Sequence, residues 1–132
     1  AIASGIIDAQ TASSNARALL ITRAIHEIQD IAQQFGASRE TVLSLAGVGD
    51  LMLTCQGTQS RNYTVGYEIG SGTALNTYLA KVDFVPEGIN TTRAIQDVLQ
   101  QQRITAPIIT TVTDIVHNDV SAENLIHTIL TQ

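Results

Sequence analysis

The spacing of apolar residues along this chain predicts helices over most of its length. Between Asn15 and Phe35, apolar side chains recur at about three- and four-residue steps, as on one face of an α-helix. Ser13 or Ser14 can cap the start of this helix, and Gly36 can end it. It is the longest helix that the sequence predicts, and its core-facing residues are expected to include Ile25, Ile28 and Phe35.

Six further segments have the apolar spacing of helices. They cover residues 38–47, 61–69, 73–79, 87–103, 108–117 and 121–130, with a short turn at 50–54. The expected caps are Ser38, Thr73 and Ser121, and Pro107 lies at a favourable first-turn position.

The segment 82–85 is the only stretch that resembles a strand, and Pro86 closes it off. No β-α-β pattern and no Gly-x-Gly-x-x-Gly motif is present, so the chain cannot form a complete nucleotide-binding fold by itself. The pattern predicts a single all-α domain over residues 1–132, with about seven helices.

Composition narrows the class of protein. A chain of 132 residues that is 44% hydrophobic can bury one core. Its net charge of −5, with only seven basic residues, argues against nucleic acid or a membrane surface as partner. A single cysteine excludes an internal disulfide and fits a reducing, cytoplasmic location, and no apolar stretch reaches membrane-spanning length. Because the chain begins with Ala inside an apolar segment, we expect it to be part of a longer protein.

The polar residues with the most chemical interest flank one short loop. Asp50 precedes this loop, and Arg61 follows it between Ser60 and Asn62, where the helical pattern resumes. A guanidinium at the start of a helix suits phosphate oxygens, because both the helix N–H groups and the planar donor fork can bind them. The alternative is that Asp50 caps a helix and Arg61 is a solvated loop residue. The spacing alone leaves both interpretations open.

Five motifs distinguish this sequence further. They are Gly47-Val48-Gly49-Asp50-Leu51-Met52-Leu53-Thr54-Cys55, Ser60-Arg61-Asn62, Val85-Pro86-Glu87-Gly88, Ala3-Ser4-Gly5 and Asn15-Ala16-Arg17-Ala18. With these motifs in register along its whole length, the sequence resembles the C-terminal domain of bacterial NAD(P)-dependent glycerol-3-phosphate dehydrogenase. The resemblance implies a fold similar to the C-terminal domain of the 6-phosphogluconate dehydrogenase-like group.

The resemblance also implies an activity and partners. Such enzymes interconvert dihydroxyacetone phosphate and glycerol 3-phosphate with NAD or NADP in glycerophospholipid synthesis. The substrate would lie between this domain and an N-terminal Rossmann domain, and a homodimer is expected. The alternative function is a non-enzymatic helical module that binds another protein.

Site residues follow from the matching motifs. The resemblance implies that Asp50, Ser60, Arg61 and Asn62 bind the substrate, with Ser60, Arg61 and Asn62 at its phosphate. It further implies that Arg61, Val85 and Glu87 contact the cofactor.

The sequence departs from the family in two places. The catalytic lysine of the family would fall just before Ala1, so no catalytic residue is expected within this chain, and the only lysine present, Lys81, is predicted to lie on the surface. The stretch 8–14 replaces a loop that is usually glycine-rich, so the resemblance does not predict how the chain enters the long helix.

The remaining reactive side chains are assigned structural roles. His26, His117 and His127 lack partners at metal-ligand spacing. Cys55 is predicted to be a packed thiol. The tyrosines at helical spacing are predicted to be half-buried core residues: Tyr63, Tyr67 and Tyr78.

Overall fold

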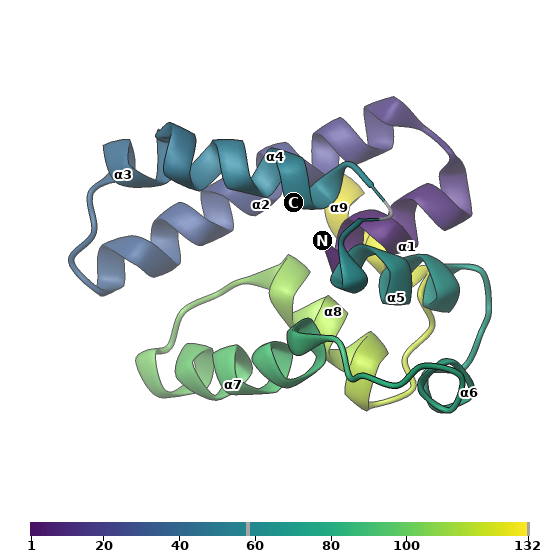
Figure 1. Cartoon of the computed structure of the whole chain (residues 1–132). Helices are drawn as coiled ribbons and strands as arrows, with labels where there is room; N and C mark the ends of the chain where they lie inside the picture. Colours follow the sequence, from purple (N-terminus) through teal and green to yellow (C-terminus); the bar gives the residue numbers. More distant parts are fainter. Residues whose placement is uncertain (58, 132) are drawn as a thin grey trace.

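The computed structural model describes residues 1–57 and 59–131. These residues are 75% helical and form no strands (Figure 1). Within them lie nine α-helices and one π-helical turn. Their bounds are α1 Ile2–Thr11, α2 Ser14–Gln34, α3 Arg39–Leu43, η1 Leu45–Gly49, α4 Asp50–Cys55, α5 Arg61–Gly70, α6 Leu75–Leu79, α7 Glu87–Gln102, α8 Pro107–His117 and α9 Asn124–Thr131. The all-α prediction is confirmed. The two helices beyond the predicted seven are α1 and α4.

The long helix α2 begins and ends close to where the sequence predicts. The Ser13 hydroxyl oxygen accepts a hydrogen bond from the Ala16 N–H at 3.3 Å, and Gly36 follows the helix with a φ of 80°. The prediction of its core-facing residues is wrong in part, because Ile28 is 36% and Phe35 61% exposed. The second half of α2 instead buries Glu27, because this side chain is bonded to another helix.

The segment that follows α2 is broken into three short elements. Ser38 caps α3 as predicted, since its hydroxyl oxygen accepts from the Thr41 N–H at 3.2 Å. The predicted continuous helix over 38–47 is wrong, because α3 ends at Leu43 and the π-helical turn η1 begins at Leu45. A side chain at Gly47 would overlap the carbonyl oxygen of Val42, so this turn requires glycine there.

The connection between α5 and α7 also differs from the prediction. Thr73 is not the cap of α6, because Ala74 is, and the Thr73 hydroxyl donates to the Glu68 carboxylate at 3.0 Å. The segment 82–85 forms no strand, since no second strand is available among the described residues to complete a ladder. Instead it leads to Pro86, which is fully buried and precedes α7. The predicted capping position of Ser121 is wrong, because α9 begins only at Asn124; the Ser121 hydroxyl oxygen accepts from the Glu123 N–H at 3.4 Å.

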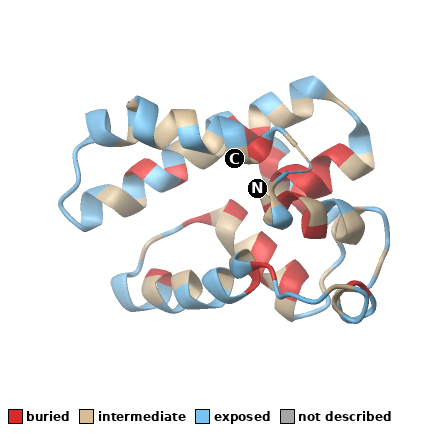
Figure 2. Cartoon of the chain, viewed as in Figure 1, coloured by how far each residue is buried: buried red, intermediate tan, exposed pale blue. Residues whose placement is uncertain are grey.

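The core is built around α1 (Figure 2). Its apolar residues pack with residues of α5, α8 and α9, and the fully buried members of this cluster are Ile6, Ile7, Val65, Leu125 and Ile129. Glycines allow α1 and α5 to touch along their backbones. A side chain at Gly5 would overlap the Tyr63 carbonyl oxygen, and one at Gly66 would overlap the Ile2 carbonyl oxygen. The start of α5 is therefore held against α1 at backbone distance.

Candidate functional site

A cavity of about 340 Å³ lies between the first turn of α1 and the facing parts of α2, α7 and α8. Most residues around it are apolar, and its polar lining residues are Glu27, Asn62, Thr91 and Thr92. Leu51, which follows Asp50 in α4, also lines it. The cavity thus joins residues from both halves of the fold, which Figure 1 shows as the α2–α4 arm above and α7–α8 below.

The start of α5 presents hydrogen-bond donors near this cavity. The Ser60 hydroxyl oxygen caps the helix by accepting from the Tyr63 N–H at 3.2 Å, so its own proton remains to be donated. Arg61 is the first residue of α5 and is exposed. Its guanidinium can only donate hydrogen bonds. The two side chains are therefore suited to an acceptor-rich ligand.

Asn62 ties the start of α5 to the start of α7. Its side-chain oxygen accepts a hydrogen bond from the Gly88 N–H at 2.8 Å. Because an N–H can only donate, the amide oxygen must face Gly88, which leaves the amide NH2 to donate to a ligand. A Cβ at Gly88 would lie 2.7 Å from that oxygen and 2.9 Å from the Ile2 side chain. A side chain at position 88 would therefore have to displace the ends of both the Asn62 and the Ile2 side chains.

The Asn62–Gly88 contact brings four of the predicted site residues together. Val85 and Glu87 are exposed on either side of the buried Pro86, and the contact places them beside Arg61 and Asn62. The Arg61 guanidinium carbon lies 4.6 Å from the centre of the Phe84 ring. Among the described residues, no carboxylate forms an ion pair with Arg61.

Asp50 is not among the residues that line the cavity. It is the exposed first residue of α4, and Gly49 rather than Asp50 is the N-cap residue, without a side-chain cap bond. Among the described residues, Asp50 makes no hydrogen bond to Ser60, Arg61 or Asn62. Its carboxylate is nevertheless one residue from Leu51 in the cavity wall.

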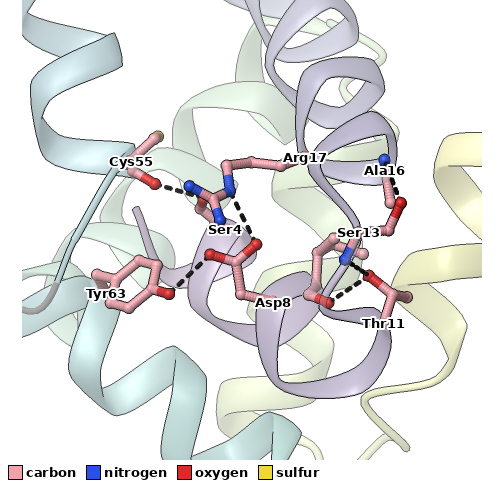
Figure 3. Close-up of polar contacts among 9 residues, drawn as sticks. Ser4, Asp8, Thr11, Ser13, Ala16, Arg17, Cys55 and Tyr63 are labelled. Atoms are coloured by element: carbon pink, nitrogen blue, oxygen red, sulfur yellow. Dashed lines mark hydrogen bonds and ion pairs between the residues drawn. The ribbon is translucent and has the colours of Figure 1, made fainter.

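A buried polar network lies behind the start of α5 (Figure 3). The Tyr63 hydroxyl donates to one Asp8 oxygen at 2.7 Å, and the Arg17 Nε donates to the other at 2.8 Å. Burial, and next the hydrogen bond to the Asp8 carboxylate, raise the pKa of Tyr63 to about 12. This network fixes the helix that carries Arg61 and Asn62 against α1 and α2.

The atypical stretch 8–14 forms the end of α1 and a turn that leads into α2. Ala12 ends α1 in the left-handed conformation, with a φ of 48°, and its N–H donates to the Asp8 carbonyl at 3.0 Å. Glycine is the residue that usually occupies such a position. The chain therefore enters α2 through an ordinary left-handed turn without it.

The other reactive side chains lie outside the cavity lining. Cys55 is buried, as predicted, and its carbonyl accepts from the Ser4 hydroxyl at 2.8 Å. Lys81 is exposed, as predicted. The prediction of half-buried tyrosines is wrong for Tyr67, which is exposed, and Tyr63 and Tyr78 are more deeply buried than predicted. The described part of the chain holds no cluster of His, Cys, Asp or Glu arranged to bind a metal, and none of its helices is long and apolar enough to span a membrane.

Three residues of the site region are not among the site residues that the sequence predicts. Glu27 lines the cavity from α2, Gly88 holds Asn62, and Phe84 lies against Arg61. Gly88 stood in a recognised motif, but its partner Asn62 is 26 residues away. The packing of α7 against α5 shows what Gly88 and Phe84 contact, and the packing of α2 against α8 shows what Glu27 contacts.

The fold and the sequence of this chain are similar to those of known proteins. A glycerol-3-phosphate dehydrogenase from Coxiella burnetii has a crystal structure that superposes with a TM-score of 0.93 at 35% identity, over 99% of this chain and 40% of that one. Glycerol-3-phosphate dehydrogenases [NAD(P)+] of Staphylococcus epidermidis and Gluconobacter oxydans are 37% and 43% identical over 130 residues, which is 98% of this chain and 39% and 40% of theirs. The chain thus spans about two fifths of the length of these curated relatives.

These matches place the chain in a class, the helical domains of NAD(P)-dependent oxidoreductases. The family model that matches residues 1–127 is described as the NAD-dependent glycerol-3-phosphate dehydrogenase C-terminus. The chain belongs to this family. The resemblance noted in the sequence is confirmed, and the alternative of a non-enzymatic interaction module is not favoured.

Proposed function

We propose that this chain is the substrate-binding domain of an sn-glycerol-3-phosphate dehydrogenase, which interconverts dihydroxyacetone phosphate and glycerol 3-phosphate. The observation that carries the proposal is the set of groups at the start of α5. The Ser60 hydroxyl, the Arg61 guanidinium and the Asn62 amide NH2 can all donate hydrogen bonds, and Arg61 has no carboxylate partner among the described residues. Three such donor groups next to a helix N-terminus suit a phosphate dianion.

The predicted site residues have distinct roles in this proposal. Ser60, Arg61 and Asn62 hold the phosphate. Asp50, which directly precedes the cavity-lining Leu51, accepts a hydrogen bond from a substrate hydroxyl, which orients the carbon that is reduced or oxidised. The proton that this carbon's oxygen gains or loses is assigned to a lysine just before Ala1.

NAD or NADP supplies the hydride in this class of enzyme. Arg61, Val85 and Glu87 fit the edge of such a cofactor, because all three are exposed and the segments that carry them are joined by the Asn62–Gly88 hydrogen bond and the Arg61–Phe84 contact. Since the described residues contain no β-α-β unit, the rest of the cofactor must be held by an N-terminal Rossmann domain. We further propose a homodimer located in the cytoplasm.

The isolated chain is expected to be inactive in this scheme. Hydride transfer requires a nicotinamide held against the substrate carbonyl, which this domain cannot provide alone. Oxidation of NADH or NADPH by the purified 132-residue chain with dihydroxyacetone phosphate would contradict the proposal.

The decisive test is Arg61→Ala in the full-length protein. Loss of a desolvated, charge-assisted contact to a dianion should cost about 2–4 kcal/mol, or about 30- to 1000-fold in kcat/KM for dihydroxyacetone phosphate. Arg61→Lys should restore only part of this, because an ammonium lacks the planar donor fork. The control is Arg39→Ala, at an exposed residue of α3. Equal kcat/KM for Arg61→Ala and Arg39→Ala would refute the phosphate assignment.

A further inference from the structure

We propose that Phe84 is a positioning residue that holds the Arg61 guanidinium ready to bind the substrate phosphate. This inference rests on the function proposed above and adds a residue from the segment 80–86, which the substrate itself need not touch. The guanidinium carbon of Arg61 lies 4.6 Å from the centre of the Phe84 ring, well inside the range of about 6 Å for cation–π contacts.

The contact with Phe84 leaves the hydrogen-bonding capacity of the guanidinium available. Arginine carries five N–H donors, and a phenyl ring has no oxygen or nitrogen to accept hydrogen bonds from them. A carboxylate in the same place would occupy these donors and neutralise the charge. The uncharged Phe84 ring restrains the side chain and leaves its positive charge for a dianion.

The backbone that carries Phe84 is fixed close to the site. Two residues after Phe84 comes Pro86, which is fully buried, and two residues further the Gly88 N–H donates to Asn62 at 2.8 Å. The start of α5 is thus joined to the start of α7 by the Asn62–Gly88 hydrogen bond and to the segment before α7 by the Arg61–Phe84 contact. Phe84 itself is 36% exposed, so its ring is not a member of the buried core.

The test compares Phe84→Leu with Phe35→Leu in the full-length enzyme. These are the two phenylalanines of the chain, and both are exposed. Leucine keeps most of the apolar bulk at position 84 but removes the aromatic face. We expect the KM for dihydroxyacetone phosphate to rise about two- to fivefold in Phe84→Leu with kcat unchanged, and Phe84→Tyr to restore it. Phe35→Leu should match the unmodified enzyme.

Two measurements separate positioning from a general loss of structure. With dihydroxyacetone, which lacks the phosphate, Phe84→Leu should have the same kcat/KM as the unmodified enzyme. In an Arg61→Ala background, Phe84→Leu should have no further effect on the KM for dihydroxyacetone phosphate. An equal loss with both substrates, or an undiminished effect in the Arg61→Ala background, would overturn the positioning role.

The outcome also distinguishes this inference from the proposed function. If Arg61→Ala weakens dihydroxyacetone phosphate binding while Phe84→Leu behaves as Phe35→Leu does, only the role of Phe84 is wrong. If Arg61→Ala itself has no effect, the phosphate site is wrong.

Discussion

The Glu27 carboxylate accepts a hydrogen bond of 2.6 Å from the backbone N–H of Ile108, 81 residues further along the chain. Its second oxygen accepts from the Ile109 N–H at 3.2 Å. The first turn of α8 has no cap of its own, because it follows Ala106. A carboxylate from α2 therefore satisfies the free N–H groups of α8 and lies favourably at the positive end of its dipole. This contact joins two walls of the cavity.

Loss of this contact should destabilise the protein. Glu27→Ala leaves buried N–H groups without their acceptor, so the free energy of unfolding should fall by about 2–3 kcal/mol. Glu27→Gln keeps one acceptor oxygen and should lose less. Urea denaturation measures both changes. Glu123→Ala, at an exposed position before α9, is the control and should change the free energy of unfolding by about 0.5 kcal/mol or less. Equal midpoints for Glu27→Ala and Glu123→Ala would contradict the capping role.

The two faces of α2 should differ in their sensitivity to truncation. Leu20 is 2% exposed, so Leu20→Ala should cost about 2–5 kcal/mol of unfolding free energy. Ile28 is 36% exposed at the edge of the cavity, and Ile28→Ala should cost about 1 kcal/mol or less. Thermal or urea denaturation of the two variants compares them directly. If Ile28→Ala costs as much as Leu20→Ala, Ile28 is buried in solution and the orientation of α2 is different.

Ala12 offers a stabilising substitution. Its φ of 48° is unfavourable for a residue with a Cβ and neutral for glycine. Ala12→Gly should therefore raise the free energy of unfolding by about 0.5–1 kcal/mol, after the larger entropy of glycine in the unfolded chain is subtracted. Ala18→Gly, at an exposed position inside α2, should lower it by about 1 kcal/mol. A decrease in Ala12→Gly as well would show that the left-handed turn is absent.

The raised pKa of Tyr63 predicts a loss of stability in alkali. Below pH 10 both the folded and the unfolded protein keep this phenol protonated, so the contribution of Tyr63 is complete. Between the usual tyrosine pKa of 10.0 and about 12, only the unfolded state releases the proton, and stability falls as pH rises. Tyr63→Phe should remove up to about 2–3 kcal/mol of this decline. Urea denaturation at several alkaline pH values measures it, and Tyr67→Phe, at an exposed tyrosine of the same helix, is the matched control.

Local chemistry accounts for the parts of the fold that the sequence predicts well. The ends of α2 depend on Ser13 and Gly36, which act on their own neighbours, and α8 begins at Pro107 as expected. The segment 82–85 was interpreted as a strand because its composition favours extended backbone, but a strand also needs a partner. The orientation of α2 could not be predicted either. It depends on the contact between Glu27 and Ile108, which periodicity cannot reveal.

In the candidate site, too, the sequence predicts what neighbouring residues determine but not what contacts between distant segments determine. Ser60, Arg61 and Asn62 are contiguous, so one motif was enough to identify them together. That Val85 and Glu87 lie beside them depends on the Asn62–Gly88 hydrogen bond, and the role of Phe84 depends on the path of the chain before α7. These contacts join segments that the sequence separates, and no residue in either segment specifies its partner.

The backbone contact between α1 and α5 makes these two helices one rigid unit. Ile2 lies against Gly66, and Ile6 lies against Gly70, so the contact advances in the same direction along both helices. Any chemical group joined to the amino end of α1 is consequently kept at a constant separation from Arg61 and Asn62. The glycines thereby fix the distance between the amino end of α1 and the start of α5. A single methyl group added at Gly66 would change this distance without altering any residue that binds a ligand.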